Sequence, residues 1–212
     1  MIELVLVRHG NTFGPGDPVV WVGRNEDVPL VESGREQARR LRGALSAAEW
    51  SPSAALSGGL ARQTEHLAIA TGGEPAPTVA RELDEIDYGP WGGLTTDEIV
   101  ERFGADEVTA WNERSAWPTS WPGSLEGVQA GVRALADEIA AGRHGERVIA
   151  CSSNGLLRWF LDLEPGRLDS ALQDGTFKMR TGNVGTLRWG TGSGKSGWTV
   201  ESWNRPPEEL FA

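Results

Sequence analysis

Arg8, His9 and Gly10 stand directly after a run of apolar residues, in the stretch LVLVRHGNT near the start of the chain. A neutral imidazole can attack phosphorus and form a phosphohistidine, which divides one difficult phosphoryl transfer into two easier steps. A neighbouring guanidinium can hold the phosphate oxygens through its planar fork, and a glycine lets the backbone approach closely. The alternative is that Arg8 and His9 are ordinary loop residues. Phosphoryl transfer therefore requires a second cation and an acid for the leaving oxygen elsewhere in the chain.

Three apolar runs predict the strands that would position such a site: residues 2–8, 54–57 and 147–152. Helical patterns follow them, and strands that alternate with helices are typical of a mostly parallel sheet covered on both faces. We therefore predict a three-layer α/β sandwich formed by a single domain, residues 1–212. Sites in such sheets lie beyond the carboxyl ends of the strands, which is where Arg8 and His9 stand.

The helices are bounded by capping signals. Ser33 with Glu36 predicts a capping box at the start of the first helix, and Thr95 with Glu98 predicts another. The spacing of apolar residues predicts further helices over residues 60–70, over residues 125–139 and from about residue 156. Irregular segments are expected at residues 13–31, 72–90 and 111–123. Two late strands are expected around a glycine-rich turn, at residues 185–190 and 198–204.

The composition narrows the function classes. The chain has a formal net charge of -10, so neither nucleic acid nor an anionic membrane is an expected partner. Its one cysteine, Cys151, continues the apolar run of a strand and is expected to be a buried thiol. A lone cysteine, no recognisable signal segment and no apolar run of roughly 18 residues predict a cytoplasmic protein. No cluster of residues has the spacing of metal ligands, so no metal is expected.

Five segments in order resemble the histidine phosphatase superfamily, also called the phosphoglycerate mutase-like family: LVRHGNT, GRNEDVPLVESGREQARRL, SGGLARQTEHLA, LDEIDYGPWGGLTTDEI and VIACSSNGLLRWFL. Arg8 and His9 match the family's first arginine and its nucleophilic histidine. Asn11 takes the Glu/Gln position of the RHG-[EQ]-T signature. The resemblance implies an enzyme without a cofactor that acts on a small phosphate ester.

The resemblance also supplies the second cation and the acid. An ungapped match of SGGLAR puts the second phosphate-binding arginine at Arg62, whereas a match anchored on the following Gln-Thr pair puts Leu60 there. Arg62 is preferred because an aliphatic side chain cannot neutralise phosphate; its alternative is a solvated helix arginine. Glu85 matches the family's acid, which can protonate the leaving alkoxide. Asp84 and Asp87 compete with it on chemistry alone.

The chain departs from the family where a second histidine is expected. Counting back from Arg158 puts Ser153 at that position, followed by Asn154. A serine hydroxyl can donate one hydrogen bond but brings no positive charge. His144 is expected at the opposite end of the strand and His66 on a helix face, so neither is expected to replace it.

A second departure lies in the loop after residue 10, which lacks the family's Trp-Asn pair. Backbone donors near Gly23, or the Arg24 side chain, are expected to contact the phosphate instead. At least half of five tryptophans in irregular surroundings are expected to pack in the core, and the others to line a substrate cavity. They are Trp21, Trp91, Trp111, Trp117 and Trp121.

The leading hypothesis is a metal-independent phosphatase that hydrolyses a small organic phosphate monoester through a phosphohistidine. A phosphoglycerate mutase is the second hypothesis. The third is a weakly active or non-catalytic protein that binds a phosphorylated ligand, because Ser153 replaces the histidine. The chain is expected to be a monomer or a homodimer.

Overall fold

The computed structural model describes residues 1–142, 144–192 and 195–210. Six strands of these residues form one sheet in the order β3-β2-β4-β1-β5-β6. Only β5 runs against the other strands in the described sheet, so the sheet is mostly parallel, as predicted. The strands are β1 (Ile2–Arg8), β2 (Ala54–Ser57), β3 (Thr78–Val79), β4 (Arg147–Ser152), β5 (Val184–Gly192) and β6 (Lys195–Arg205).

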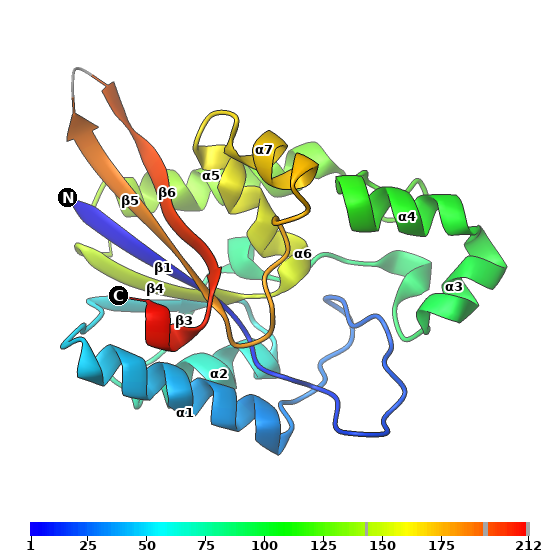
Figure 1. Ribbon diagram of the computed structural model, residues 1–212, viewed down its shortest axis with the longest axis horizontal. Coiled ribbons are helices and arrows are strands. Elements are labelled where there is room, and N and C mark those ends of the chain that lie inside the picture. Colours follow the sequence, from blue (N-terminus) through cyan, green and yellow to red (C-terminus); the bar gives the residue numbers. More distant parts are fainter. Residues whose placement is uncertain (143, 193–194, 211–212) are drawn as a thin grey trace.

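Helices cover both faces of this sheet (Figure 1). On one face lie α1 (Glu32–Ala47) and α2 (Ala61–Thr71). On the other lie α5 (Leu125–Ala140), α6 (Asn154–Leu157) and α7 (Arg167–Gln173). The pair α3 (Thr96–Phe103) and α4 (Ala105–Arg114) projects from one end of the molecule. The three-layer α/β sandwich is confirmed.

Side chains of the central strand β1 pack against the helical layers on both faces of the sheet. Its side chains point alternately to the two faces, and Val5 and Leu6 are both completely buried. Val5 belongs to an apolar cluster with α1 and α2, which includes Leu41 and Leu67. Leu6 belongs to a larger cluster with α5, which includes Ile139. Two separate cores thus fix the end of β1, where Arg8 and His9 follow.

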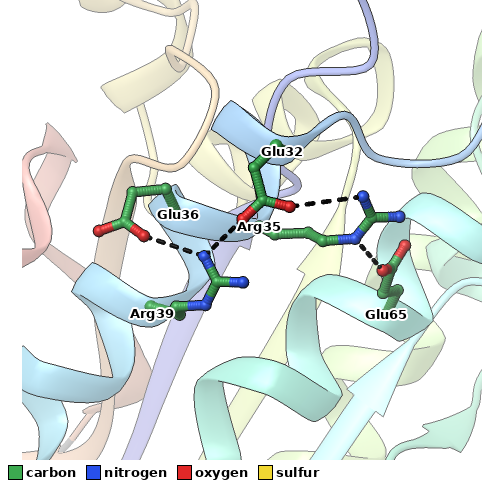
Figure 2. A network of polar contacts seen from close by, with 5 residues as sticks. All are labelled: Glu32, Arg35, Glu36, Arg39 and Glu65. Atoms are coloured by element: carbon green, nitrogen blue, oxygen red, sulfur yellow. Dashed lines mark hydrogen bonds and ion pairs between the residues drawn. The ribbon is translucent and has the colours of Figure 1, made fainter.

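Charged side chains connect α1 and α2 on the outer surface (Figure 2). Arg35 Nε lies 2.6 Å from Glu65 Oε1, and Arg39 pairs with both Glu32 and Glu36 within α1. Partly exposed pairs of this kind contribute about 0.2–1 kcal/mol each. Burial of the apolar faces therefore outweighs them in holding the two helices together.

Two predicted helix boundaries are wrong. The helix α1 begins at Glu32 and its N-cap is Val31, without a side-chain cap. Ser33 therefore lies inside the helix, where its hydroxyl accepts a hydrogen bond from Asn11 Nδ2 (3.3 Å). Residues 111–114, predicted to be irregular, belong to α4, whose Trp111 is buried in the core. Burial of the Trp111 side chain in the core stabilises this last turn of α4, although the local sequence does not predict a helix there.

Other predicted elements are confirmed. Thr95 and Glu98 form the expected capping box of α3, and Cys151 is a buried thiol in β4. The late strands form the hairpin β5–β6, whose turn includes residues outside the described range. The short helix near residue 156 begins two residues early, at Asn154, and continues as a 3-10 helix over Arg158–Leu163. No helix of the described residues is long and apolar enough to cross a membrane.

Candidate active site

A cavity of about 580 Å³ opens beyond the carboxyl ends of β1 and β4. Six of the predicted site residues line it: Arg8, His9, Asn11, Arg62, Glu85 and Asn154. The remaining wall consists of apolar loop residues and of α4 and its neighbours, including Phe13, Val20, Trp21, Tyr88, Trp111, Asn112, Arg158 and Lys178. Segments far apart in the sequence therefore meet at the sheet edge where parallel α/β folds place their ligands.

His9 is held with one ring nitrogen free. Its Nδ1 lies 2.8 Å from the carbonyl oxygen of Gly10. A carbonyl can only accept a hydrogen bond, so Nδ1 carries the proton and Nε2 of the neutral ring keeps its lone pair. The Gly10 peptide is fixed in turn, because its N–H donates to Nδ1 of His66 (3.0 Å). Gly10 is also packed so closely on Gly34 that a Cβ there would overlap backbone.

The surroundings of His9 keep it neutral. Burial lowers the pKa of His9 well below its usual value, and the positive charges of Arg62 and Arg8 lower it further. An unprotonated imidazole is the form that can attack phosphorus. The position of this ring at the end of β1 thus gives both the geometry and the protonation state of a nucleophile.

Arg8 and Arg62 supply two positive charges close to His9. Arg8 Nη1 donates to the carbonyl of Met179 (2.6 Å), and its buried Nε has no hydrogen-bond partner among the described residues. Arg62 Nη1 donates to the carbonyl of Glu26 (2.7 Å) and Nη2 donates to that of Gly23 (3.1 Å). Neutral carbonyl oxygens orient both guanidinium groups without neutralising them, which leaves the charge for a bound anion.

Glu85 is a buried carboxyl in the same cavity, as the resemblance implied. Its Oε1 accepts a hydrogen bond from the N–H of Ile86 (2.8 Å). Burial raises the pKa of Glu85, while that hydrogen bond and the charges of Arg62, Arg158 and Arg8 oppose the rise. A carboxyl whose pKa is raised is suited to hold and release a proton.

The loop residues Gly23 and Arg24, predicted to contact the phosphate, do not line the cavity, although the neighbouring Val22 does. The N–H of Gly23 donates to the Glu26 carboxylate (2.7 Å), and its carbonyl accepts from Arg62. Arg24 Nε donates to the carbonyl of Glu85 (3.3 Å). The loop therefore orients Arg62 and braces the Glu85 segment.

Ser153 also lies outside the cavity lining, although Asn154 contributes to it. Ser153 is 1 % exposed and its hydroxyl accepts a hydrogen bond from Gln63 Nε2 (3.0 Å) on α2. This hydroxyl, predicted to contact substrate, therefore points toward α2 and not into the cavity. Asn154 Oδ1 accepts from the N–H of Met179 (2.8 Å), which ties α6 to the segment that orients Arg8. The amide of Asn11 is similarly engaged, since its Oδ1 accepts from Thr181 Oγ1 (2.6 Å).

Sequence reasoning missed three contributors to the site. His66 was expected on a helix face but is fully buried against Gly10. Arg158 was used only to locate the position of the family's second histidine, yet it lines the cavity. Tyr88 packs beside Glu85, and burial together with the Glu85 charge raises the pKa of its hydroxyl well above the usual value. One sequence feature could have indicated Arg158 and Tyr88 as site residues: they lie within two of the segments that resemble the family, VIACSSNGLLRWFL and LDEIDYGPWGGLTTDEI.

The tryptophans divide between the core and the cavity. Trp91 and Trp121 are buried, and their rings meet edge to face at 5.1 Å. Trp111 is buried as well but also contributes to the cavity wall, together with the half-buried Trp21. Aromatic rings in such edge-to-face contacts form a rigid wall. The structure thus contains tryptophans packed in the core and tryptophans that line the cavity, as the sequence predicted.

A family model described as "Histidine phosphatase superfamily (branch 1)" matches residues 4–206. The chain belongs to the histidine phosphatase superfamily. The fold is similar to that of the α-ribazole phosphatase of Shigella flexneri, with a TM-score of 0.75, 19% identity and 97% of each chain covered. A mycobacterial glucosyl-3-phosphoglycerate phosphatase is 25% identical, with a TM-score of 0.74, over 96% of this chain and 99% of that one.

A curated relative of this superfamily member carries a different activity in its name. The 2,3-bisphosphoglycerate-dependent phosphoglycerate mutase of Mesorhizobium japonicum is 30% identical over 129 residues, which are 57% of this chain. The match spans 58% of the length of that mutase. Phosphatases and mutases are therefore both represented among the proteins to which this chain is similar.

Proposed function

We propose that this protein is a phosphatase that hydrolyses a small organic phosphate monoester through a phosphohistidine on His9. The observation that carries the proposal is the hydrogen bond from His9 Nδ1 to the Gly10 carbonyl. It leaves Nε2 unprotonated beside Arg8 and Arg62, which line the same cavity. Two guanidinium groups can neutralise the phosphate oxygens, so the proposed reaction uses side-chain cations and no metal ion or cofactor.

The proposed reaction has two steps. Nε2 of His9 attacks phosphorus, the bond from phosphorus to the ester oxygen breaks, and the leaving oxygen takes a proton from Glu85. A water oxygen then attacks phosphorus while Glu85 accepts a proton from that water, the bond from phosphorus to Nε2 of His9 breaks, and inorganic phosphate leaves the neutral imidazole. A bound phosphate dianion favours the protonated form of the neighbouring Glu85 carboxyl at the start of the first step.

Labelling of the protein tests this proposal directly. A phosphate ester labelled with ³²P is mixed with the protein and quenched within milliseconds to seconds. We expect label that is stable in base and labile in acid, and we expect His9→Ala to lose it together with phosphate release. Half-buried His144 provides a matched control, because His144→Ala removes a histidine that does not line the cavity and should keep both. Label retained by His9→Ala would exclude His9 as the nucleophile.

The named activity of the curated relative favours one second candidate, phosphoryl transfer of the mutase type. A mutase moves the phosphoryl group within its substrate and releases little phosphate. Incubation with 3-phosphoglycerate distinguishes the two, because a mutase forms the 2-phospho isomer while a phosphatase forms glycerate and phosphate. Ligand binding without label or turnover would instead indicate a non-catalytic phosphate-binding protein.

A further inference from the structure

The loop between β1 and α1 brings a run of apolar side chains to the cavity. Residues 13–22 of this loop form neither helix nor strand, and they lie at the same end of the molecule as α3 and α4 (Figure 1). The apolar members of this segment that line the cavity are Phe13, Val19, Val20, Trp21 and Val22. We call residues 13–22 the apolar loop. The proposed reaction gives these side chains no role, because none of them is charged or titratable.

Trp21 anchors the apolar loop to the segment that precedes α3. Its N–H donates to the carbonyl of Leu94 (2.9 Å), and its own carbonyl accepts from the N–H of Gly93 (2.8 Å). The indole Nε1 donates to Thr96 Oγ1 (3.1 Å). The same ring meets that of Tyr88 edge to face, with the centroids 5.3 Å apart. Backbone and side-chain contacts therefore fix the loop where it borders the cavity.

The lining of the cavity becomes more exposed from the sheet edge to the apolar loop. His9 and Glu85 are 6 % and 4 % exposed, whereas Val19 is 67 % exposed, and all three line the same cavity. The groups that would act on phosphorus and on the ester oxygen therefore lie at the floor, and Val19 lies at the mouth. An ester whose phosphoryl group is held beside His9 must direct its alcohol part away from the floor, toward the mouth that the apolar loop borders.

The exposure of Val19 differs in kind from that of a valine elsewhere on the surface. A single exposed apolar side chain is common in proteins and needs no explanation. Val79 is such a residue, since it is 54 % exposed and does not line the cavity. Val19 instead continues the apolar lining formed by Phe13 and Val20, which are only half-buried themselves. Removing this continuous apolar surface from water is favourable, so a ligand that covers it gains affinity.

We propose that the apolar loop is a subsite for an apolar alcohol part of the substrate, with Val19 at its outer end. The inference rests on the proposed function and specifies its substrate class as phosphate monoesters of alcohols whose carbon chain is apolar for several carbons. The apolar lining is continuous with the catalytic residues, which makes the substrate itself the occupant. Valine and phenylalanine side chains offer no hydrogen bond to hydroxyl groups, so a sugar phosphate would lose hydrogen bonds to water at this loop.

Two esters with the same chemistry at phosphorus test the subsite. Ethyl phosphate and hexyl phosphate both release a primary alcohol, so both need the proton from Glu85 to the same degree. They differ only in the length of the apolar chain. Each methylene group removed from water contributes at most about fourfold, so we expect kcat/KM to be about 10- to 100-fold higher for the hexyl ester.

Substitutions of two exposed valines show whether the apolar loop causes this ratio. Val19→Ser should lower the ratio of the two kcat/KM values by about 3- to 10-fold, because it removes methyl groups from the mouth. Val19→Leu should raise the ratio, because it extends the apolar surface. The matched control is Val79→Ser on β3, outside the cavity lining, which should keep the wild-type ratio. The Tm of each variant checks that the fold is unchanged.

Three results would overturn the subsite. A wild-type ratio near 1 would show that the alcohol part of the substrate does not contact the apolar loop. Equal ratios in Val19→Ser and Val79→Ser would show that Val19 is not part of the subsite. Equal loss of kcat/KM on both esters in Val19→Ser would mean that this side chain supports the shape of the cavity and does not select the alcohol.

Failure of the proposed function is distinguishable. If neither ester is turned over, calorimetric binding of ethylphosphonate and hexylphosphonate to wild-type protein and to both serine variants replaces kinetics. A preference for the hexyl compound that decreases in Val19→Ser and persists in Val79→Ser supports the subsite without catalysis. Equal binding of the two compounds, no binding of either, or a preference that Val19→Ser leaves unchanged overturns it.

Discussion

His66 offers a sharp test of how the nucleophile is held. The ring is fully buried, and its Nδ1 accepts the N–H of Gly10, so the neutral form carries its proton on Nε2. Burial lowers the pKa of His66 from 6.5 to about 4. Protonation of His66 Nδ1 would turn this acceptor into a donor facing the Gly10 N–H and would break the hydrogen bond. The substitution His66→Asn keeps an acceptor oxygen near the position of Nδ1 but removes the titratable group.

The magnitude follows from the shift in pKa. Because the pKa is lower in the folded protein, the unfolded chain binds the proton more readily as the pH falls from 6.5 toward 4. Stability present above pH 6.5 is therefore lost across this range and falls no further below it. The full shift corresponds to about 3 kcal/mol, of which about 2 kcal/mol is lost by pH 5. Other titrating groups are common to wild type and variant and cancel in the comparison.

Urea unfolding at pH 7.5 and at pH 5 measures this effect in wild type, in His66→Asn and in the control His144→Asn. We expect wild type and the control to lose about 2 kcal/mol more than His66→Asn on acidification. An equal loss in all three proteins would refute the argument that His66 is a buried neutral acceptor. A kinetic test uses the variant His66→Leu, which leaves the buried Gly10 N–H without an acceptor. An unpaired donor of this kind costs about 1–3 kcal/mol. His66→Leu should lower kcat more than it raises KM, and His66→Asn should restore part of kcat.

Three further substitutions probe the acid and its surroundings. Glu85→Gln should lower kcat on alkyl phosphates by about 10²–10⁴-fold and far less on aryl phosphates, whose leaving groups need little protonation; equal losses would remove Glu85 from the role of acid. Ser153→His should cost about 1–3 kcal/mol by overpacking against Gln63 and should not speed aryl phosphate hydrolysis. A faster variant with unchanged Tm would show that this position reaches the cavity. Gly155→Ala would place a Cβ 2.5 Å from the Tyr88 hydroxyl and 2.6 Å from Glu85 Oε1. We therefore expect kcat to fall while the circular dichroism spectrum stays unchanged. Turnover equal to that of the wild type would contradict this packing.

The predicted site residues that the structure brings together in the cavity are those fixed by short local patterns. His9 follows a strand that is apolar on both faces, so its place at the sheet edge depends only on that strand being central. Glu85 and Arg62 lie within contiguous segments that carry the family resemblance. The same reasoning gave the layers of the fold, because buried strands and amphipathic helices have distinct periods along the chain.

The predicted site residues that lie outside the cavity lining share one physical feature, which is that protein groups compete with substrate for their hydrogen bonds. Gly23 and Arg24 were assigned to phosphate because they follow the signature loop. Their polar groups are instead engaged by Glu26, Arg62 and the Glu85 backbone. Ser153 was assigned by counting, yet Gln63 binds its hydroxyl. A donor or acceptor is available to substrate only when no protein group binds it first, and spacing along the chain does not contain that information.

The opposite shifts in the pKa values of His9 and Glu85 explain how one cavity can hold a neutral base and a protonated acid. Burial disfavours the charged form of each group, so it lowers the pKa of the imidazole and raises that of the carboxyl. The arginines lower both pKa values, which favours the free imidazole but opposes the protonated acid. A bound phosphate dianion would cancel the influence of the arginines on the pKa of Glu85, because it neutralises the nearby guanidinium charges. In the proposed reaction, binding of the ester therefore favours the protonated form of Glu85, which is the form that can give a proton to the leaving oxygen.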